Sequence, residues 1–181
     1  MMLRLFNLLM RRRSSRRELF VHDDDWGQIE VLPASCTVWC AQEMGRLGTF
    51  AAEHEAPGGS GWTDMYVRRK PPAQIADLAI PFAAAVDALR ARLPEFDVVT
   101  SGTFSAPQPV PYVRAFGPAH NVGVVLVPDR TRCSLEMISL VLDGEDAACA
   151  KVVGALAALP AAEPLLLADW LGGRTVLLAA E

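Results

Sequence analysis

A run of acidic residues near the start of the chain has the residue types of a metal or recognition site. In order, the run reads His22, Asp23, Asp24, Asp25, Trp26 and Gly27. Carboxylates this close together can bind a divalent cation or raise one another's pKa. The spacing fits no calcium loop, because an EF-hand needs ligands at alternating positions that end in Glu. The run is therefore either a solvated turn, which Asp and Gly favour, or an acidic recognition surface extended by Glu30 and Asp64.

A second segment combines aromatic and charged residues at every other position. Two sets of side chains alternate along it: Trp62, Asp64, Tyr66 and Arg68, and between them Thr63, Met65 and Val67. This alternation predicts a strand over 62–67 with the first set on one face. Trp, Tyr and Arg are enriched in protein-binding hot spots. The same face is equally typical of the solvent side of a sheet edge guarded by charge, so both interpretations stay open.

Two cysteines have a spacing that suits zinc. Cys36 and Cys40 are four residues apart on one face of a predicted helix, and His54 lies on the same stripe. His54 follows Cys40 by 14 residues, which is ~21 Å along a straight helix, so the three side chains cannot share a metal there. Free cysteines commonly pack as small core residues. We therefore favour buried structural thiols and expect no metal.

The glycine-rich run 58–61 invites two enzymatic interpretations. A nucleophile elbow needs the pattern G-x-S-x-G, but Trp62 stands where the last glycine belongs. A phosphate-binding loop needs a Lys-Ser/Thr ending and a following helix, and the sequence predicts neither. An ordinary glycine turn is the simpler explanation. We assign no catalytic residue and expect no cofactor.

Charge divides the chain into two unequal parts. The 181 residues carry a net charge of -4, but six of the 17 basic residues lie in the first 17 positions, and all 21 acidic residues follow them. Residues 18–181 therefore have a net charge of -10. A body of this charge should repel nucleic acid and attract a basic protein partner. The basic arm, 1–17, is typical of a disordered tail, although it could contact anionic polymers or lipid.

The start of the sequence matches no export signal. In the arm an apolar stretch precedes the arginines, the reverse of a secretory signal, and the acidic run follows the Arg16-Arg17 pair where a twin-arginine signal needs an apolar segment. No stretch approaches the ~20 apolar residues of a membrane helix. Four cysteines without a C-x-x-C pattern fit reduced thiols. We expect a cytoplasmic protein, and the excess of Arg over Lys suggests a GC-rich bacterial genome.

Hydrophobic periodicity predicts the secondary structure. Helical patterns cover 35–54, with Ser35 as the N-cap, then 75–93, and a segment after Gly144 that ends before Pro160. Pro81 either kinks the second helix or begins it after a separate short turn. Strand patterns cover 20–21, 28–32, 62–67, 96–100, 122–127, 133–142, 165–167 and 174–178. The segments 122–127 and 133–142 predict a hairpin with a bulge near Met137, and the proline-rich 106–111 predicts an extended loop.

Strands and helices that mix without strict alternation predict an α+β fold. We expect residues 18–181 to form a single domain, with a mostly antiparallel sheet and about three helices packed on one face. Trp26 and Trp39 are expected in the core.

Two functional hypotheses follow. The first is a non-catalytic acidic module that binds a basic protein partner; an immunity protein that neutralises a basic toxin fits it at the level of class. Its expected binding residues are Asp23, Asp24, Asp25, Glu30, Trp62, Asp64, Tyr66 and Arg68. The second is a small hydrolase or metal-dependent enzyme, because catalytic groups often converge only in the fold. Its expected site gathers His22, Asp24, Glu30 and Asp64, with His120 as a further candidate.

Overall fold

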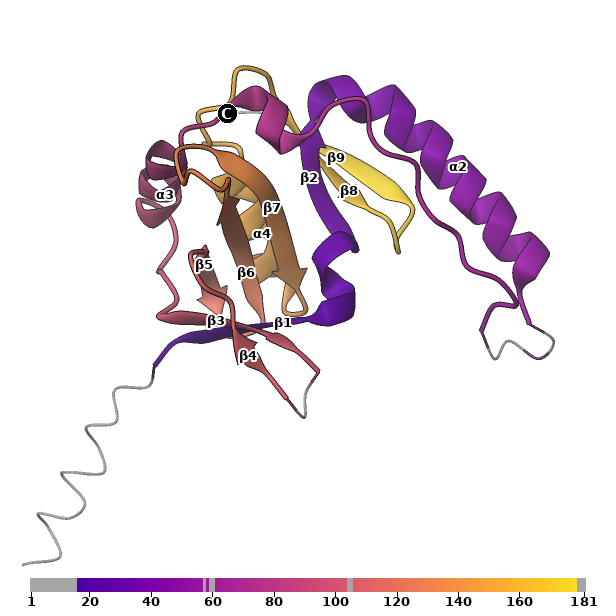
Figure 1. The fold of residues 1–181 in the computed structure, drawn as a ribbon, viewed down its shortest axis with the longest axis horizontal. Coiled ribbons are helices and arrows are strands. Elements are labelled where there is room, and N and C mark those ends of the chain that lie inside the picture. Colours follow the sequence, from indigo (N-terminus) through magenta and orange to yellow (C-terminus); the bar gives the residue numbers. More distant parts are fainter. Residues whose placement is uncertain (1–15, 57, 59–60, 104–105, 179–181) are drawn as a thin grey trace, which may run out of the picture.

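A six-stranded antiparallel sheet is the centre of the molecule (Figure 1). The computed structural model describes residues 16–56, 58, 61–103 and 106–178. In order across the sheet, the strands are β5 (Arg114–Ala119), β6 (Val122–Pro128), β7 (Leu135–Leu142), β2 (Ile29–Pro33), β8 (Leu165–Asp169) and β9 (Arg174–Leu178). In the described register, β2 and β7 meet at one pair, Glu30 with Ser139. The sheet is therefore two antiparallel three-stranded units joined at its middle.

A small second sheet packs across the β5–β6 end. It contains β1 (Glu18–His22), β3 (Val98–Gly102) and β4 (Gln108–Pro109), and β1 runs parallel to β3. Its apolar side chains, among them Leu19, Val21 and Val99, pack with Ala115 and Val125 of the large sheet. The turn η1 (Asp23–Gly27) leads from β1 into β2, so the acidic run connects the two sheets.

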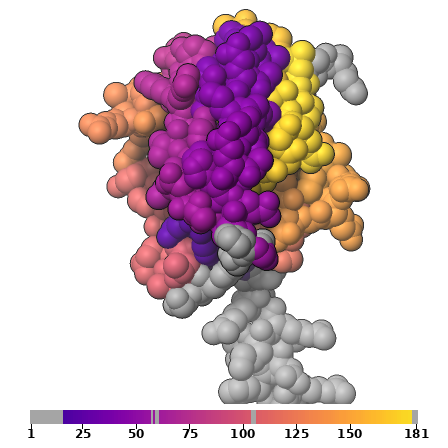
Figure 2. Space-filling model, turned by 90° about the vertical axis from the view of Figure 1, so that its right-hand side faces the viewer, coloured from indigo at the N-terminus to yellow at the C-terminus, as the bar shows by residue number. Residues whose placement is uncertain are grey.

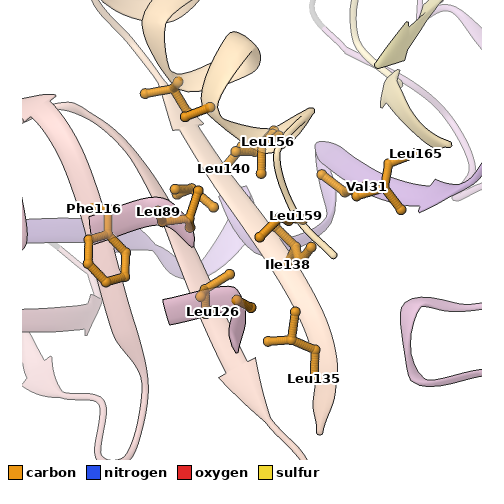
Figure 3. Close-up of a cluster of buried hydrophobic side chains, with 14 of the residues drawn as sticks. Val31, Leu89, Phe116, Leu126, Leu135, Ile138, Leu140, Leu156, Leu159 and Leu165 are labelled. Atoms are coloured by element: carbon orange, nitrogen blue, oxygen red, sulfur yellow. The ribbon is translucent and has the colours of Figure 1, made fainter. Parts of the chain in front are cut away.

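Two helices cover one face of the large sheet. They are α3 (Phe82–Arg90) and α4 (Asp146–Leu156), and a short turn η3 (Ile75–Leu78) packs beside β7. Their apolar faces pack with side chains from all six strands of the large sheet in one cluster. Figure 3 shows part of this cluster around Leu89, Leu126, Ile138 and Leu156. Because Val31, Leu165 and Leu167 point into this cluster, the alternate residues of β2 and β8 must point to the other face.

The long helix α2 (Thr37–His54) lies on that other face. Leu32, Leu166 and Ala168 pack there with Cys36 and Cys40, where the turn η2 (Ala34–Cys36) leads into the helix. The chain then returns beside α2 as an extended segment, residues 61–72, which we call the return segment (Figures 1 and 2). In Figure 2 the helix and the return segment lie side by side, and yellow β9 flanks the helix on the other side.

The α+β class and the mostly antiparallel sheet are confirmed. The expectation that all helices share one face is wrong, since α2 lies opposite α3 and α4. Pro81 precedes α3 and follows the separate turn η3, as the second alternative predicts. The hairpin of β6 and β7 has its register shift beside Met137. Ser35 is not a helix cap, because α2 begins one residue after Cys36.

The structure differs from the sequence prediction at Arg17 and at strand β5. Arg17, assigned to the basic arm, belongs to the fold: its guanidinium donates to the carbonyls of Glu95 (3.1 Å) and Gly117 (2.6 Å) and lies over the Phe96 ring. Residues 1–15 lie outside the described part of the chain. Strand β5 was not predicted, because Gly117 and Pro118 interrupt its pattern. Among the described residues, no helix is long and apolar enough to cross a membrane.

Candidate functional site

A buried carboxylate fixes the return segment to α2. The side chain of Glu43, in the middle of the helix, is 0% exposed. It accepts hydrogen bonds from the Tyr66 hydroxyl (2.8 Å), the Arg69 backbone N–H (2.9 Å) and the Arg46 guanidinium (Nε, 2.8 Å). A buried charge is stable only when it is paired and hydrogen-bonded. Two of these donors, on Tyr66 and Arg69, join the return segment to the helix, and the third, Arg46, belongs to α2 itself.

These donors also set the pKa of Glu43. Burial alone would raise the pKa of this carboxyl, but the Arg69 N–H, the Arg46 side chain and the Tyr66 hydroxyl outweigh burial and lower the pKa below its usual value of 4.5. Glu43 is therefore ionised at neutral pH. It is a structural anion rather than a proton donor.

A second contact holds the middle of the return segment to the sheet. Arg68 donates to both carboxylate oxygens of Glu30 (3.0 and 3.3 Å) and to the Gly27 carbonyl (2.8 Å). Its guanidinium also lies 4.3 Å from the ring centroid of Trp170, whose Nε1 donates to Glu30 at 2.9 Å. Glu30 is thus held by both Arg68 and Trp170, although 27% of the Arg68 side chain and 32% of the Glu30 side chain remain exposed.

An apolar groove opens between α2, the return segment and the β8–β9 turn. It has a volume of about 620 Å³, within the usual range of ligand pockets. Its lining residues are Met44, Leu47, Gly48, Phe50, Ala51, Trp62, Asp64, Met65, Tyr66, Trp170, Leu171 and Gly173. Asp64 is the one charged residue among them. We call this hollow the α2 groove.

The groove exists because α2 runs beyond the sheet. In Figure 1 the second half of the helix and the start of the return segment project past the β8–β9 turn. The apolar stripe that includes Cys36 and Cys40 continues as Leu47 and Ala51, which line the groove and do not belong to the buried cluster of the two cysteines. Trp62 is 66% exposed and Leu171 76% exposed. Large apolar side chains gathered around a hollow in this way mark interaction sites.

The structure brings part of the predicted binding set together. Trp62, Asp64 and Tyr66 line the α2 groove, and Arg68 pairs with Glu30 beside it. The predicted strand over 62–67 is wrong: only Trp62 forms an isolated bridge, with Glu55, and the segment packs along a helix instead of a sheet. Tyr66 and Arg68 point inward as a result.

The acidic turn lies in η1, next to the cluster of Arg68. Asp24 is exposed, and its carboxylate is 3.4 Å from His22 Nδ1, while the Asp23 carboxylate accepts from Ser101 Oγ at 3.0 Å. Trp26 is partly buried and its Nε1 donates to the same Ser101 hydroxyl at 2.8 Å. The turn is therefore fixed from its inner side, which leaves Asp24 facing solvent.

The residues of the enzymatic hypothesis lie apart. His22, at the end of β1, is next to Asp24 in η1, but Glu30 is paired with Arg68 and Asp64 lies on the return segment. His120 lies in the turn between β5 and β6. Across the described residues, no three His, Cys, Asp or Glu side chains form a group that could hold a metal ion.

The cysteines occupy structural positions. Cys36 and Cys40 are both fully buried under α2, as expected, and His54 lies at the far end of the helix. Burial raises the pKa of the Cys40 thiol to about 11, so this thiol is protonated at neutral pH. Cys36 Sγ donates to the carbonyl of Ala73, the residue that follows the return segment, at 3.3 Å, which ties this part of the chain to the start of the helix.

Sequence reasoning missed the residues that organise the site. Glu43 was not singled out, although its position three residues after Cys40 and four before Leu47 places it on the apolar stripe of the helix. A single carboxylate on such a stripe indicates a buried ionic contact. Trp170 and Leu171 follow the penultimate strand and carry no spacing that connects them with Trp62.

Comparison with known proteins does not assign the site. No family model, curated protein or solved structure matches the chain. The function is therefore argued from the residues of the groove and their surroundings.

Proposed function

We propose that this chain is a non-catalytic protein-binding module whose docking surface is the α2 groove. The observation that carries the proposal is the apolar lining of a groove that projects beyond the sheet, with Trp62 and Leu171 largely exposed. Burial of these side chains by a partner would contribute ~25 cal/mol per Å² of apolar surface before the entropic cost of association is subtracted.

The walls of the groove suit a protein ligand. Trp62 and Tyr66 are residue types enriched at hot spots, and Met44 and Met65 have flexible side chains that adapt to a partner's surface. Glu43 and Arg68 hold the return segment from behind, so the groove needs no partner to form. A preformed surface loses less conformational entropy on binding.

The net charge of the body supports a basic partner. Residues 18–181 have a net charge of -10, and the exposed Asp24 lies in η1, whose last residue, Gly27, accepts a hydrogen bond from Arg68. Long-range attraction would then speed the encounter while the groove provides affinity. A bacterial immunity-type protein that binds a basic toxin in the cytoplasm is the class this combination fits best.

Met65 and Val67, two positions apart on the return segment, offer a matched test. Met65 lines the groove and is 80% exposed, whereas Val67 lies outside it and is 78% exposed. Partners would be captured from a lysate of the native host with the wild type, Met65→Asp and Val67→Asp. We expect a specific protein that the wild type and Val67→Asp retain and Met65→Asp loses. Equal retention by all three proteins would refute the groove as the docking surface.

The acidic turn is tested separately. Changing Asp23, Asp24 and Asp25 together to Asn should slow association with the captured partner and reduce its dependence on salt, with little change in the dissociation rate. Stopped-flow or surface binding kinetics at two salt concentrations measure both rates. An unchanged association rate would remove the turn from the interface and leave the groove untouched.

A further inference from the structure

Gly48 is an unexplained glycine inside α2. Glycine in a helix interior costs stability relative to alanine, so it usually has a packing reason. Here a Cβ added to Gly48 meets no atom within 4 Å, and the residue lies in a helical conformation that alanine adopts readily. Nothing inside the described fold requires its missing side chain. Gly48 also lines the α2 groove, where an occupant could approach the helix backbone.

The wall around Gly48 has the dimensions of a helix-binding groove. Its α2 side extends from Met44 to Ala51, which is two helical turns or ~11 Å. Amphipathic helices bind such grooves with apolar residues at every third and fourth position. A small residue at the crossing point lets two helix backbones approach closely.

Unpaired acidic residues mark one end of the groove. Asp64 lines it, is exposed, and has no Lys, Arg or His within ion-pair distance in the described part of the chain. Glu55 lines a smaller adjoining hollow that shares Ala51 and Trp62 with the groove, and it too is without an ion pair among the described residues. Charge complementarity therefore places basic side chains of the occupant at this end.

We propose that the α2 groove binds an amphipathic helix of a partner protein, with its closest approach at Gly48 and its basic residues beside Asp64 and Glu55. This inference rests on the proposed function and specifies its ligand. The occupant presents about two turns of apolar stripe, the length of the α2 wall, followed by Lys or Arg. Its contact with Gly48 explains a residue that the fold alone does not.

The test uses the full chain and three synthetic peptides. The first is a 14-residue helical peptide with a leucine stripe and lysines at one end, and the second has glutamates in place of these lysines. The third is residues 1–15 of this chain, in which apolar residues are likewise followed by arginines. Titration calorimetry measures the affinity of each peptide. A change in the NMR chemical shift of the Gly48 backbone amide on peptide binding shows that the peptide occupies the groove.

Gly48→Ala and Gly45→Ala form the matched pair of variants. An added Cβ at Gly45 also meets nothing within 4 Å, but Gly45 does not line the groove. We expect both substitutions to raise the midpoint of thermal unfolding, since both replace a helical glycine. Only Gly48→Ala should weaken binding of the lysine peptide, by about fivefold or more, because its methyl group enters the contact. The lysine peptide should bind about two- to fivefold more tightly than the glutamate peptide, and Asp64→Asn should remove part of that difference.

Three other outcomes would reject a basic helix from a partner protein as the occupant, but they would not test whether the groove binds a protein. Equal affinity of the lysine and glutamate peptides, or equal binding by Gly48→Ala and wild type, rejects the basic helix. Failure of both designed peptides to bind at millimolar concentration rejects a helical occupant. Tightest binding by residues 1–15 assigns the groove to a segment of this chain instead of a partner. In all these cases the capture experiment with Met65→Asp and Val67→Asp still reports whether the groove docks a protein.

Discussion

The Tyr66 hydroxyl donates a 2.8 Å hydrogen bond to the buried carboxylate of Glu43. This contact joins an extended segment to a helix across 23 residues of sequence, and Tyr66 also lines the α2 groove. A hydrogen bond to a charged group contributes more than one between neutral groups. The geometry of the groove therefore depends on a polar contact beneath it rather than on its apolar walls.

The first prediction concerns Tyr66. Tyr66→Phe removes one donor from a fully buried carboxylate and should lower the free energy of unfolding by about 1.5–3 kcal/mol. Urea denaturation followed by far-UV circular dichroism measures the change. Tyr112→Phe is the control, because Tyr112 is 63% exposed and its ring stacks with Arg132 at 3.6 Å. Equal effects of the two substitutions would contradict the assigned role of the Glu43 contact.

The second prediction concerns pH. The pKa of Glu43 is lower in the folded chain than its usual 4.5. A lowered folded pKa adds stability that is complete above the unfolded value and is lost as pH falls through the folded value. Wild type should therefore lose stability from about pH 4.5 downward more steeply than Glu43→Gln, which is less stable at pH 7 and cannot titrate there. Unfolding midpoints from pH 7 to pH 3 test this, and parallel curves for the two proteins would refute it.

Local periodicity was enough for most of the fold. Three elements follow from spacing, proline chemistry and turn residues, all of which act within a few residues: the β6–β7 hairpin, the break at Pro81 and the helix that ends at His54. The strand expected over 62–67 is wrong: Tyr66 and Arg68 turn inward on either side of the exposed Val67, but the segment packs along a helix instead of pairing with a strand. Alternation reports which side chains turn inward and cannot report what lies beneath them.

The candidate site was harder to predict for the same reason. Tyr66 and Arg68 were placed with Trp62 on one exposed face, yet they turn toward Glu43 and Glu30, which precede them by 23 and 38 residues. Contacts at this separation depend on how far α2 projects beyond the sheet. The apolar stripe of α2 predicts burial along its whole length, and the length of the strands decides where that burial stops.

The third prediction concerns Arg68. Arg68→Lys keeps the charge but loses the two-oxygen contact with Glu30 and the stacking on Trp170. We expect a loss of about 1–3 kcal/mol in the free energy of unfolding and a change in tryptophan fluorescence, since Trp170 loses its ring contact. Arg69→Lys is the control, because Arg69 is exposed and meets Glu43 through its backbone N–H. A fully tolerated Arg68→Lys would mean that Glu30 needs only a positive charge.

The fourth prediction concerns the start of the fold. Arg17→Ala should lower the free energy of unfolding by about 1–3 kcal/mol, because the guanidinium donates to two carbonyls and lies 4.7 Å from the Phe96 ring centroid. Arg16→Ala should leave it within about 0.5 kcal/mol, since Arg16 is exposed. Chemical denaturation of the two variants measures both values. Similar values would place Arg17 with the basic arm after all.

The fifth prediction concerns the junction between the two halves of the large sheet. Ser139 is fully buried opposite Glu30, and within the described residues its hydroxyl has no hydrogen-bond partner. A buried hydroxyl without a partner costs about 1–3 kcal/mol, so Ser139→Ala should raise the free energy of unfolding by about 1 kcal/mol. Ser101→Ala should do the opposite, because the Ser101 hydroxyl accepts from Trp26 and donates to Asp23. Calorimetric unfolding compares the two signs, and a loss of stability in Ser139→Ala would show that this hydroxyl is solvated by an internal water or has a partner in solution.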